Sequence, residues 1–258
     1  MSLWQAILFF ALGALVGRAL NAWSYRLRPK AMLNAALSLA CPLCLNLSKV
    51  FGSFPVLGFL LLKGRCRQCG QRLPWRGPIV EISAGLLFAS LAVSSSFNLR
   101  TAVLLIFLSA IIGASLTDID RRIIPDSITL GGTLFGLAAS ALIKDPPFLY
   151  AALGVVTGGG LILLMALIGR VIKGRETIGG GDIKLAAMLG AFLGWRQTVV
   201  AIVLSLFAGS VLAITLIGCK RKSWGEPLPY GPFLALGGVA ALFWGNNLFD
   251  WYLYFFRK

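Results

Sequence analysis

The sequence contains no histidine, and only nine of its 258 residues are acidic, against 24 that are basic. The absence of histidine excludes histidine-dependent nucleophilic catalysis and histidine ligands to a metal ion. Charged residues make up 13% of the chain, whereas soluble domains carry roughly 25%. Because charge is scarce here, any ionisable side chain at the edge of an apolar segment is a candidate functional residue.

Hydrophobic residues make up 58% of the chain and recur in long continuous runs. A transmembrane β-barrel would instead show alternating segments of about ten residues. The sequence therefore predicts an all-α polytopic membrane protein with about eight transmembrane helices. We expect spans at 3–23, 79–96, 101–117, 127–143, 149–172, 183–195, 197–218 and 228–247. The Gly-x-x-x-Gly pairs 132/136, 154/158 and 190/194 predict close helix packing.

The lysines and arginines predict an orientation with the N-terminus outside. Eighteen of them then lie in four segments on the cytoplasmic side (24–78, 118–126, 170–184 and 219–227), and five lie in the outer loops and tail. Cytoplasmic loops of membrane proteins carry such an excess. The same pattern explains the net charge of +15 without nucleic acid, so the expected partner is the lipid bilayer. The first span lacks a basic leader region and a cleavage site, and we expect it to be retained.

A soluble module of residues 24–78 is predicted between the first span (1–23) and a seven-helix membrane core (79–258). Its cysteines form two C-x-x-C pairs, Cys41 with Cys44 and Cys66 with Cys69. Such pairs predict a structural zinc site, because four thiolate ligands complete a tetrahedron and leave no open catalytic position. Zinc would supply folding energy that the small module lacks. The alternatives are two disulfides, which a cytoplasmic location disfavours, and four unrelated thiols.

The catalytic candidates are two carboxylates at the ends of apolar spans, predicted to lie on the same side of the membrane. Asp118 ends the third span, and Asp182 follows the glycines Gly179, Gly180 and Gly181. Two carboxylates at close range cannot easily both ionise. One can then take a proton from water while the other hydrogen-bonds a scissile carbonyl, with no metal ion. Glycines would let a substrate backbone approach closely. A structural charge pair or a pair of helix caps is the alternative.

Two neighbouring acids are given other roles. Asp120 lies about 200° round a helix from Asp118, so only one of them can face Asp182 if that stretch is helical. Asp126 follows Pro125, and we expect it to cap the next helix. A transporter with an acidic ion or proton relay is the alternative function, although it would place carboxylates deep within several spans.

Taken in order, these motifs resemble the type IV prepilin peptidases, membrane aspartyl proteases of the GxGD class. The segment from Gly179 to Lys184 matches the second catalytic motif of that family. Asp118-Ile119-Asp120 with Ile124-Pro125-Asp126 resembles the first, in which the first aspartate is catalytic. The paired-cysteine module, Pro78-Ile79-Val80-Glu81 and Pro229-Tyr230-Gly231-Pro232-Phe233 resemble further segments of the bifunctional bacterial branch.

Two positions depart from the family pattern. The family usually has a small residue and a phenylalanine before the asparagine of the first span, whereas this chain reads Gly17-Arg18-Ala19-Leu20-Asn21. An arginine within a span is unusual, and we expect Arg18 to snorkel or to pair with an acid or a lipid phosphate. Tyr230 stands where phenylalanine is common. These departures concern details of substrate recognition or methylation more than the two aspartates.

The resemblance implies an activity, with substrates and cofactors. Precursors of type IV pilins or type II secretion pseudopilins would lose a short basic leader at the cytoplasmic face of the bacterial inner membrane. Asp118 and Asp182 would be catalytic, with the three glycines, Lys184 and Asp120 in support. The family also N-methylates the new N-terminus with S-adenosylmethionine. No G-x-G-x-x-G motif supports that step independently. Glu81 marks the candidate methyltransferase region, and a buried hydrogen-bonded carboxyl is its alternative role.

Overall fold

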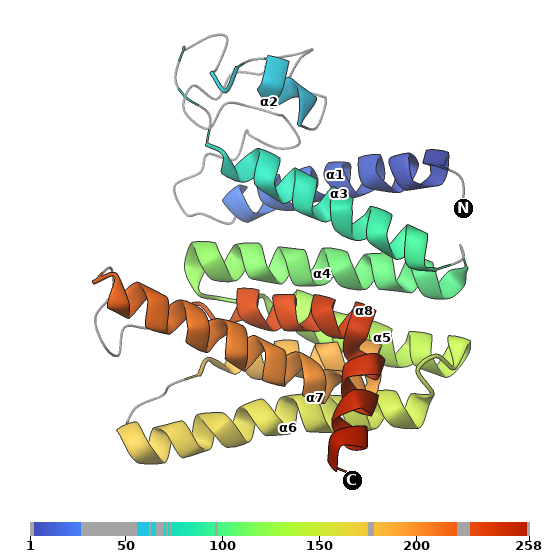
Figure 1. Ribbon diagram of the computed structural model, residues 1–258, viewed down its shortest axis with the longest axis vertical. Coiled ribbons are helices and arrows are strands. Elements are labelled where there is room, and N and C mark those ends of the chain that lie inside the picture. Colours follow the sequence, from blue (N-terminus) through green and yellow to red (C-terminus); the bar gives the residue numbers. More distant parts are fainter. Residues whose placement is uncertain are drawn as a thin grey trace. The chain divides into compact units, whose positions relative to one another are not determined.

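The computed structural model describes residues 3–26, 56–61, 63–65, 70, 72, 74–95, 98–174, 178–220 and 228–256. Its helices are Leu3–Arg26 (α1), Leu57–Leu61 (α2), Arg76–Ser94 (α3), Leu99–Arg121 (α4), Asp126–Ile143 (α5), Phe148–Lys173 (α6), Gly180–Gly218 (α7) and Gly231–Phe256 (α8) (Figure 1). Within these ranges there is no strand, only an isolated bridge between Arg65 and Arg72. Seven of the helices are long and apolar enough to cross a membrane. The all-α polytopic fold is confirmed for the described residues.

The chain forms two compact units, Met1–Leu116 and Thr117–Lys258. The boundary falls inside α4, whose last residues belong to the second unit. The predicted module at 24–78 lies mostly outside the described residues. The division into an anchor, a zinc module and a membrane core therefore stays a prediction.

In the first unit, α1 packs on α3 through small residues. A Cβ at Gly13 would lie 2.5 Å from the carbonyl oxygen of Ala84, and one at Gly17 would lie 2.9 Å from the carbonyl oxygen of Val80. Larger side chains would separate the two backbones. Close approach of this kind is how apolar helices associate in a bilayer, where the hydrophobic effect supplies no driving force.

In the second unit, α5 and α6 pack against the first half of α7, again at glycines. A Cβ at Gly154 would collide with the backbone of Gly190, and one at Gly158 would collide with that of Ala186. On α5, a Cβ at Gly136 would lie 3.0 Å from the Cβ of Ala191. The close helix packing predicted from the Gly-x-x-x-Gly pairs is thus confirmed at Gly136, Gly154, Gly158 and Gly190, whereas Gly194 is not helical.

The chain reverses direction within α7. Gly194 has φ 75° and ψ 167°, which is not a helical conformation. A Cβ added to Gly158 would meet both Ala186 and Thr198, which lie on opposite sides of this break. A straight helix would hold those two residues about 18 Å apart, so the two halves of α7 must fold back on each other. The element is a helical hairpin.

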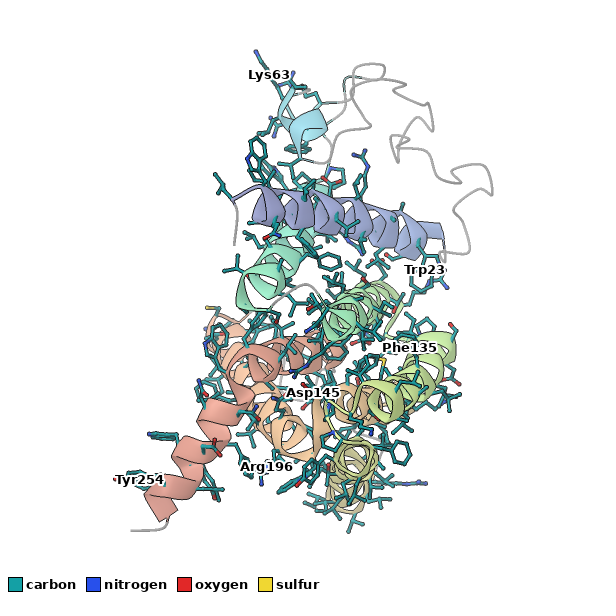
Figure 2. All side chains as sticks on the ribbon, turned by 90° about the vertical axis from the view of Figure 1, so that its right-hand side faces the viewer. Trp23, Lys63, Phe135, Asp145, Arg196 and Tyr254 are labelled. Carbon is teal, nitrogen blue, oxygen red and sulfur yellow. The ribbon has the colours of Figure 1, made fainter. Side chains whose placement is uncertain are left out.

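The eight predicted spans differ from the seven candidate helices in this element, whose two antiparallel halves correspond to two of the predicted spans. The predicted spans 183–195 and 197–218 both fall within α7, which counts once among seven candidate spans. They were expected to be separated by a loop, but Gly194 alone makes the turn. It lies beside the connection between α5 and α6, because a Cβ there would be 3.4 Å from Pro146. Figure 2 looks onto this end of the second unit, with Asp145 and Arg196 facing the viewer.

The last helix, α8, extends beyond the predicted span 228–247. Its final turns carry exposed aromatic side chains, among them Trp251 and Tyr254. In Figure 2, the ribbon around Tyr254 projects beyond the other helices of the second unit. Tyrosine and tryptophan are enriched where a membrane protein meets the lipid headgroups.

Candidate active site

Asp118 lies near the end of α4 and is only 5% exposed. Its Oδ2 accepts a hydrogen bond from the backbone N–H of Gly231, at 2.8 Å. The first N–H groups of a helix have no partner within that helix, so the start of α8 is free to supply this donor. A Cβ at Gly231 would lie 2.8 Å from the same oxygen. The carboxylate is therefore held by backbone at a position that only glycine fits.

Asp182 lies in the first turn of α7, just after the N-cap residue Gly179. The backbone N–H of Asp182 donates a hydrogen bond of 3.1 Å to the carbonyl oxygen of Gly179. Its Oδ1 is buried and has no hydrogen-bond partner among the described residues. The carboxylates of Asp118 and Asp182 lie near enough for their charges to repel each other. The structure thus brings together the two acids that the sequence singled out.

The glycine segment packs against the stretch that follows α4. A Cβ at Gly181 would lie 3.2 Å from the Cβ of Ile124, whereas one at Gly180 would meet nothing within 4 Å. A Cβ at Gly179 would lie 3.5 Å from Oδ2 of Asp182. Gly181 is therefore constrained by packing, whereas Gly180 is exposed and has open space around it.

Lys184 and Asp126 form an ion pair across the same junction. The Lys184 Nζ lies 2.7 Å from Oδ1 of Asp126. The expectation that Asp126 caps α5 is wrong: the N-cap residue is Pro125, no side chain caps that helix, and Asp126 stands in its first turn. Proline presets the backbone for entry into the helix, which leaves the aspartate free to bind the lysine.

Asp120 does not share the surroundings of Asp118. Because α4 stays helical as far as Arg121, the two side chains leave the helix about 200° apart. Asp120 is partly exposed, whereas Asp118 is buried. The assignment of the catalytic role to Asp118 stays a prediction, and its position beside Asp182 supports it.

Ser205 and Tyr230 complete the surroundings of the pair, and sequence reasoning missed the serine. The Ser205 Oγ lies 2.6 Å from the Tyr230 hydroxyl, which is close enough to Asp182 to be influenced by its charge. The sequence drew attention to Tyr230 and Gly231, because they belong to the Pro-rich motif 229–233. No motif pointed to Ser205, because it is a single serine in an apolar helix. It reaches the site only because the chain reverses at Gly194.

In the first unit, Glu81 is buried with an exposure of 8%. Its Oε2 accepts a hydrogen bond of 2.6 Å from the backbone N–H of Val56, and its Oε1 lies 3.9 Å from Nε of Arg18. The expected pairing of Arg18 with an acid is confirmed. This geometry agrees with the alternative given for Glu81, a buried hydrogen-bonded carboxyl, and its link to methylation stays a prediction.

The ligands of the predicted zinc site, Cys41, Cys44, Cys66 and Cys69, lie outside the described residues. In the part of the chain that the structure describes, no group of three histidine, cysteine or acidic side chains could hold a metal ion. The zinc site stays a prediction from the cysteine spacing.

Comparison with known proteins connects both units to one family. The model of the type IV leader peptidase family matches residues 103–214, and that of the bacterial peptidase A24 N-terminal domain matches 11–95. The prepilin leader peptidase/N-methyltransferase of Aeromonas salmonicida is 33% identical over 217 residues, covering 83% of this chain and 73% of that protein. Proteins of the same name from Stutzerimonas stutzeri and Pseudomonas aeruginosa are each 30% identical, over 84% of this chain and 75% and 74% of their own lengths.

No solved structure matches the chain. The family match nevertheless spans the segments that hold Asp118 and Asp182, and the relatives align with most of both units. The resemblance drawn from the motifs is thereby confirmed. The chain belongs to the type IV leader peptidase family.

Proposed function

We propose that this protein is an intramembrane aspartyl endopeptidase whose catalytic pair is Asp118 and Asp182. The observation that carries the proposal is the proximity of these two acids: Asp118 is buried and accepts a hydrogen bond from the Gly231 N–H, and Asp182 has a buried oxygen without a hydrogen-bond partner among the described residues. Two carboxylates so placed hold a proton between them more easily than two negative charges. That is the arrangement needed to activate water at a peptide bond.

We assign the base to Asp118 and the acid to Asp182. Asp118 accepts a hydrogen bond from the backbone N–H of Gly231, and a hydrogen bond donated to a carboxylate favours the ionised form. Oδ1 of Asp182 accepts no hydrogen bond from the described residues, so we place the single proton shared by the two acids on the carboxyl of Asp182. The ionised carboxylate takes a proton from water, and the water oxygen bonds to the scissile carbonyl carbon.

The protonated Asp182 gives its proton to the carbonyl oxygen as the tetrahedral intermediate forms. Collapse then breaks the C–N bond. The proton held by Asp118 goes to the leaving amine, and the proton of one hydroxyl returns to Asp182. The net reaction consumes one water and restores both carboxyls, with no metal ion in the cycle.

The substrates proposed are prepilins or pseudopilins, in keeping with the names of the relatives. A short basic leader would be removed at the cytoplasmic face of the inner membrane, which is where the lysine and arginine distribution places both acids. The excess of basic over acidic residues does not attract a basic leader. The local acids, with Asp118 and Asp182 foremost, would do so.

We also propose that the new N-terminus is methylated, as the names of the relatives indicate for those proteins. S-adenosylmethionine would supply an electrophilic methyl group. Near Glu81, Asn21 presents a buried Oδ1 without a partner among the described residues, and that acceptor fits a hydroxyl or ammonium donor of such a cofactor. Glu81 itself is already bound by Val56 and Arg18, so its proposed part is to hold the entry to this region.

A structural zinc ion bound by Cys41, Cys44, Cys66 and Cys69 belongs to the same proposal. The four thiolates are the donor set that zinc prefers in structural sites, and the ion would take no part in proteolysis. Metal analysis of the purified protein should find one zinc per chain. Replacement of Cys41 and Cys44 by serine should remove it.

The experiment that tests the function uses purified protein in detergent and a pilin precursor with a basic leader. Intact mass spectrometry with and without S-adenosylmethionine reports the cut site and the added methyl group together. We expect cleavage by the wild type and none by Asp118→Asn or Asp182→Asn, each of which keeps the size of the side chain. Normal processing by either variant would reject the catalytic pair.

A further inference from the structure

The hydroxyl groups of Ser205 and Tyr230 form a directed pair beside the two acids. Ser205 is fully buried, and its Oγ lies 2.7 Å from the carbonyl oxygen of Ile202 and 2.6 Å from the Tyr230 hydroxyl. A carbonyl oxygen can only accept, so the single proton of the serine goes to Ile202. The proton of the tyrosine must then go to Ser205. The phenol oxygen is left with a lone pair and no proton to offer.

The phenol stays neutral at physiological pH. Burial raises the pKa of Tyr230 above its ordinary value, and the negative charge of Asp182 raises it further. Tyr230 is therefore a fixed neutral acceptor rather than a charged group or a proton donor. Among the described residues, its hydroxyl has no hydrogen-bond partner other than Ser205.

The site consequently holds more acceptors than donors. The Oδ1 of Asp182 and the phenol oxygen of Tyr230 both lack a donor among the described residues. Tyr230 is joined directly to Gly231, whose N–H holds Asp118, so its position relative to the catalytic pair is set by backbone. Buried polar groups are normally hydrogen-bonded. A peptide chain lying across the pair would bring backbone N–H groups to satisfy these acceptors.

We propose that the phenol oxygen of Tyr230 accepts a hydrogen bond from a backbone N–H of the substrate bound at Asp118 and Asp182. Tyr230 is then a substrate-positioning residue, and Ser205 fixes the direction of its proton. This inference rests on the proposed peptidase function. Since phenylalanine is common at this position in the family, the contact would be a specificity feature of this chain.

The test compares Tyr230→Phe with the wild type in steady-state cleavage of a leader-containing peptide. A bond to the substrate that exists in the ground state and in the transition state changes KM and not kcat. We expect KM to rise about 3- to 10-fold, the range for one neutral hydrogen bond, with kcat kept within about twofold. Tyr150→Phe is the matched control, since Tyr150 lies beside Gly194, at the other end of the hairpin from Asp182.

A second arm removes the donor instead of the acceptor. Peptides in which one amide near the scissile bond is replaced by an ester lack that N–H but keep their shape. The ester peptide that lacks the N–H bound by Tyr230 should give the same KM with the wild type and with Tyr230→Phe. In a double-mutant cycle, removing one of two interacting groups abolishes the effect of removing the other. Ser205→Ala should also raise KM, and combining it with Tyr230→Phe should add nothing.

Three results would overturn the inference and leave the peptidase function standing. Unchanged kinetics of Tyr230→Phe would exclude the contact, and a loss confined to kcat would assign Tyr230 to the catalytic pair rather than to the substrate. An effect of Tyr230→Phe that persists with every ester peptide would exclude a backbone donor. Failure of the wild type to cleave any of the peptides would instead reject the peptidase function and this inference with it.

Discussion

The ammonium of Lys184 lies 2.7 Å from the carboxylate of Asp126, and this ion pair joins the start of α7 to the start of α5. Lys184 follows Asp182 in the first turns of α7, and Asp126 begins the helix after the one that carries Asp118, so the pair joins the two acid-bearing segments. Their side chains are 39% and 59% exposed, respectively. Ion pairs with that degree of exposure contribute only about 0.2–1 kcal/mol to stability. The pair is therefore better suited to alignment than to holding the fold.

Reversal of one charge should impair cleavage more than stability. Lys184→Asp places two acids together, and we expect kcat/KM to fall by about 10-fold or more as Asp182 is displaced. The free energy of unfolding should change by no more than about 1 kcal/mol. The double variant Asp126→Lys with Lys184→Asp should recover part of the activity. If the fold loss in kcat/KM of the double variant equals the product of the losses of the two single variants, the two residues act independently and the pair has no aligning role.

Gly231→Ala should reduce cleavage while the protein still inserts and folds. The new Cβ would lie 2.8 Å from Oδ2 of Asp118 and 3.1 Å from its Cβ, so the carboxylate must move. Displacement of a catalytic group by about 1 Å can cost 10²-fold, and we expect kcat to fall about 10- to 100-fold. Peptide cleavage and thermal unfolding in detergent would be measured on the same preparation.

The control for this substitution is Gly160→Ala on α6. Gly160 is exposed and a Cβ there meets nothing within 4 Å, so its activity and unfolding temperature should match those of the wild type. Equal activity of Gly231→Ala and Gly160→Ala would show that Asp118 tolerates displacement. The proposed role of the Gly231 N–H would then be wrong.

Much of the architecture could be predicted from the sequence, since apolar runs of about 20 residues report where a chain crosses a bilayer. The predicted 127–143 and 149–172 match α5 and α6 to within one residue at each end. The reversal near Gly194 was also predicted, because the expected spans 183–195 and 197–218 end and begin there, but the sequence did not indicate that a single glycine would make the turn. The two acids stood out by their charge, whereas the contacts of Ser205 and Gly231 depend on that reversal and on side-chain packing.

Asp120→Asn should retain most of the cleavage activity, in contrast to Asp118→Asn. Asp120 projects from a different face of α4, so loss of its charge leaves the pair of Asp118 and Asp182 intact. We expect kcat/KM within about threefold of the wild type, because a side chain turned about 200° from Asp118 does not reach the reacting atoms. Loss of all activity in Asp120→Asn, with cleavage retained in Asp118→Asn, would exchange the roles of the two acids.

Gly194→Ala should destabilise the second unit as a whole. At φ 75° and ψ 167° the backbone occupies a region that is open essentially only to glycine, and an L-residue there costs about 1–3 kcal/mol. Space is not the obstacle, since the added Cβ would lie 3.4 Å from Pro146. The strain must be relieved by opening the hairpin, which moves Ser205 away from Tyr230. We therefore expect a lower unfolding temperature together with reduced cleavage, measured against Gly131→Ala, where an added Cβ meets nothing within 4 Å. An unfolding temperature equal to that of the Gly131 variant would mean that the two halves of α7 do not depend on glycine to reverse.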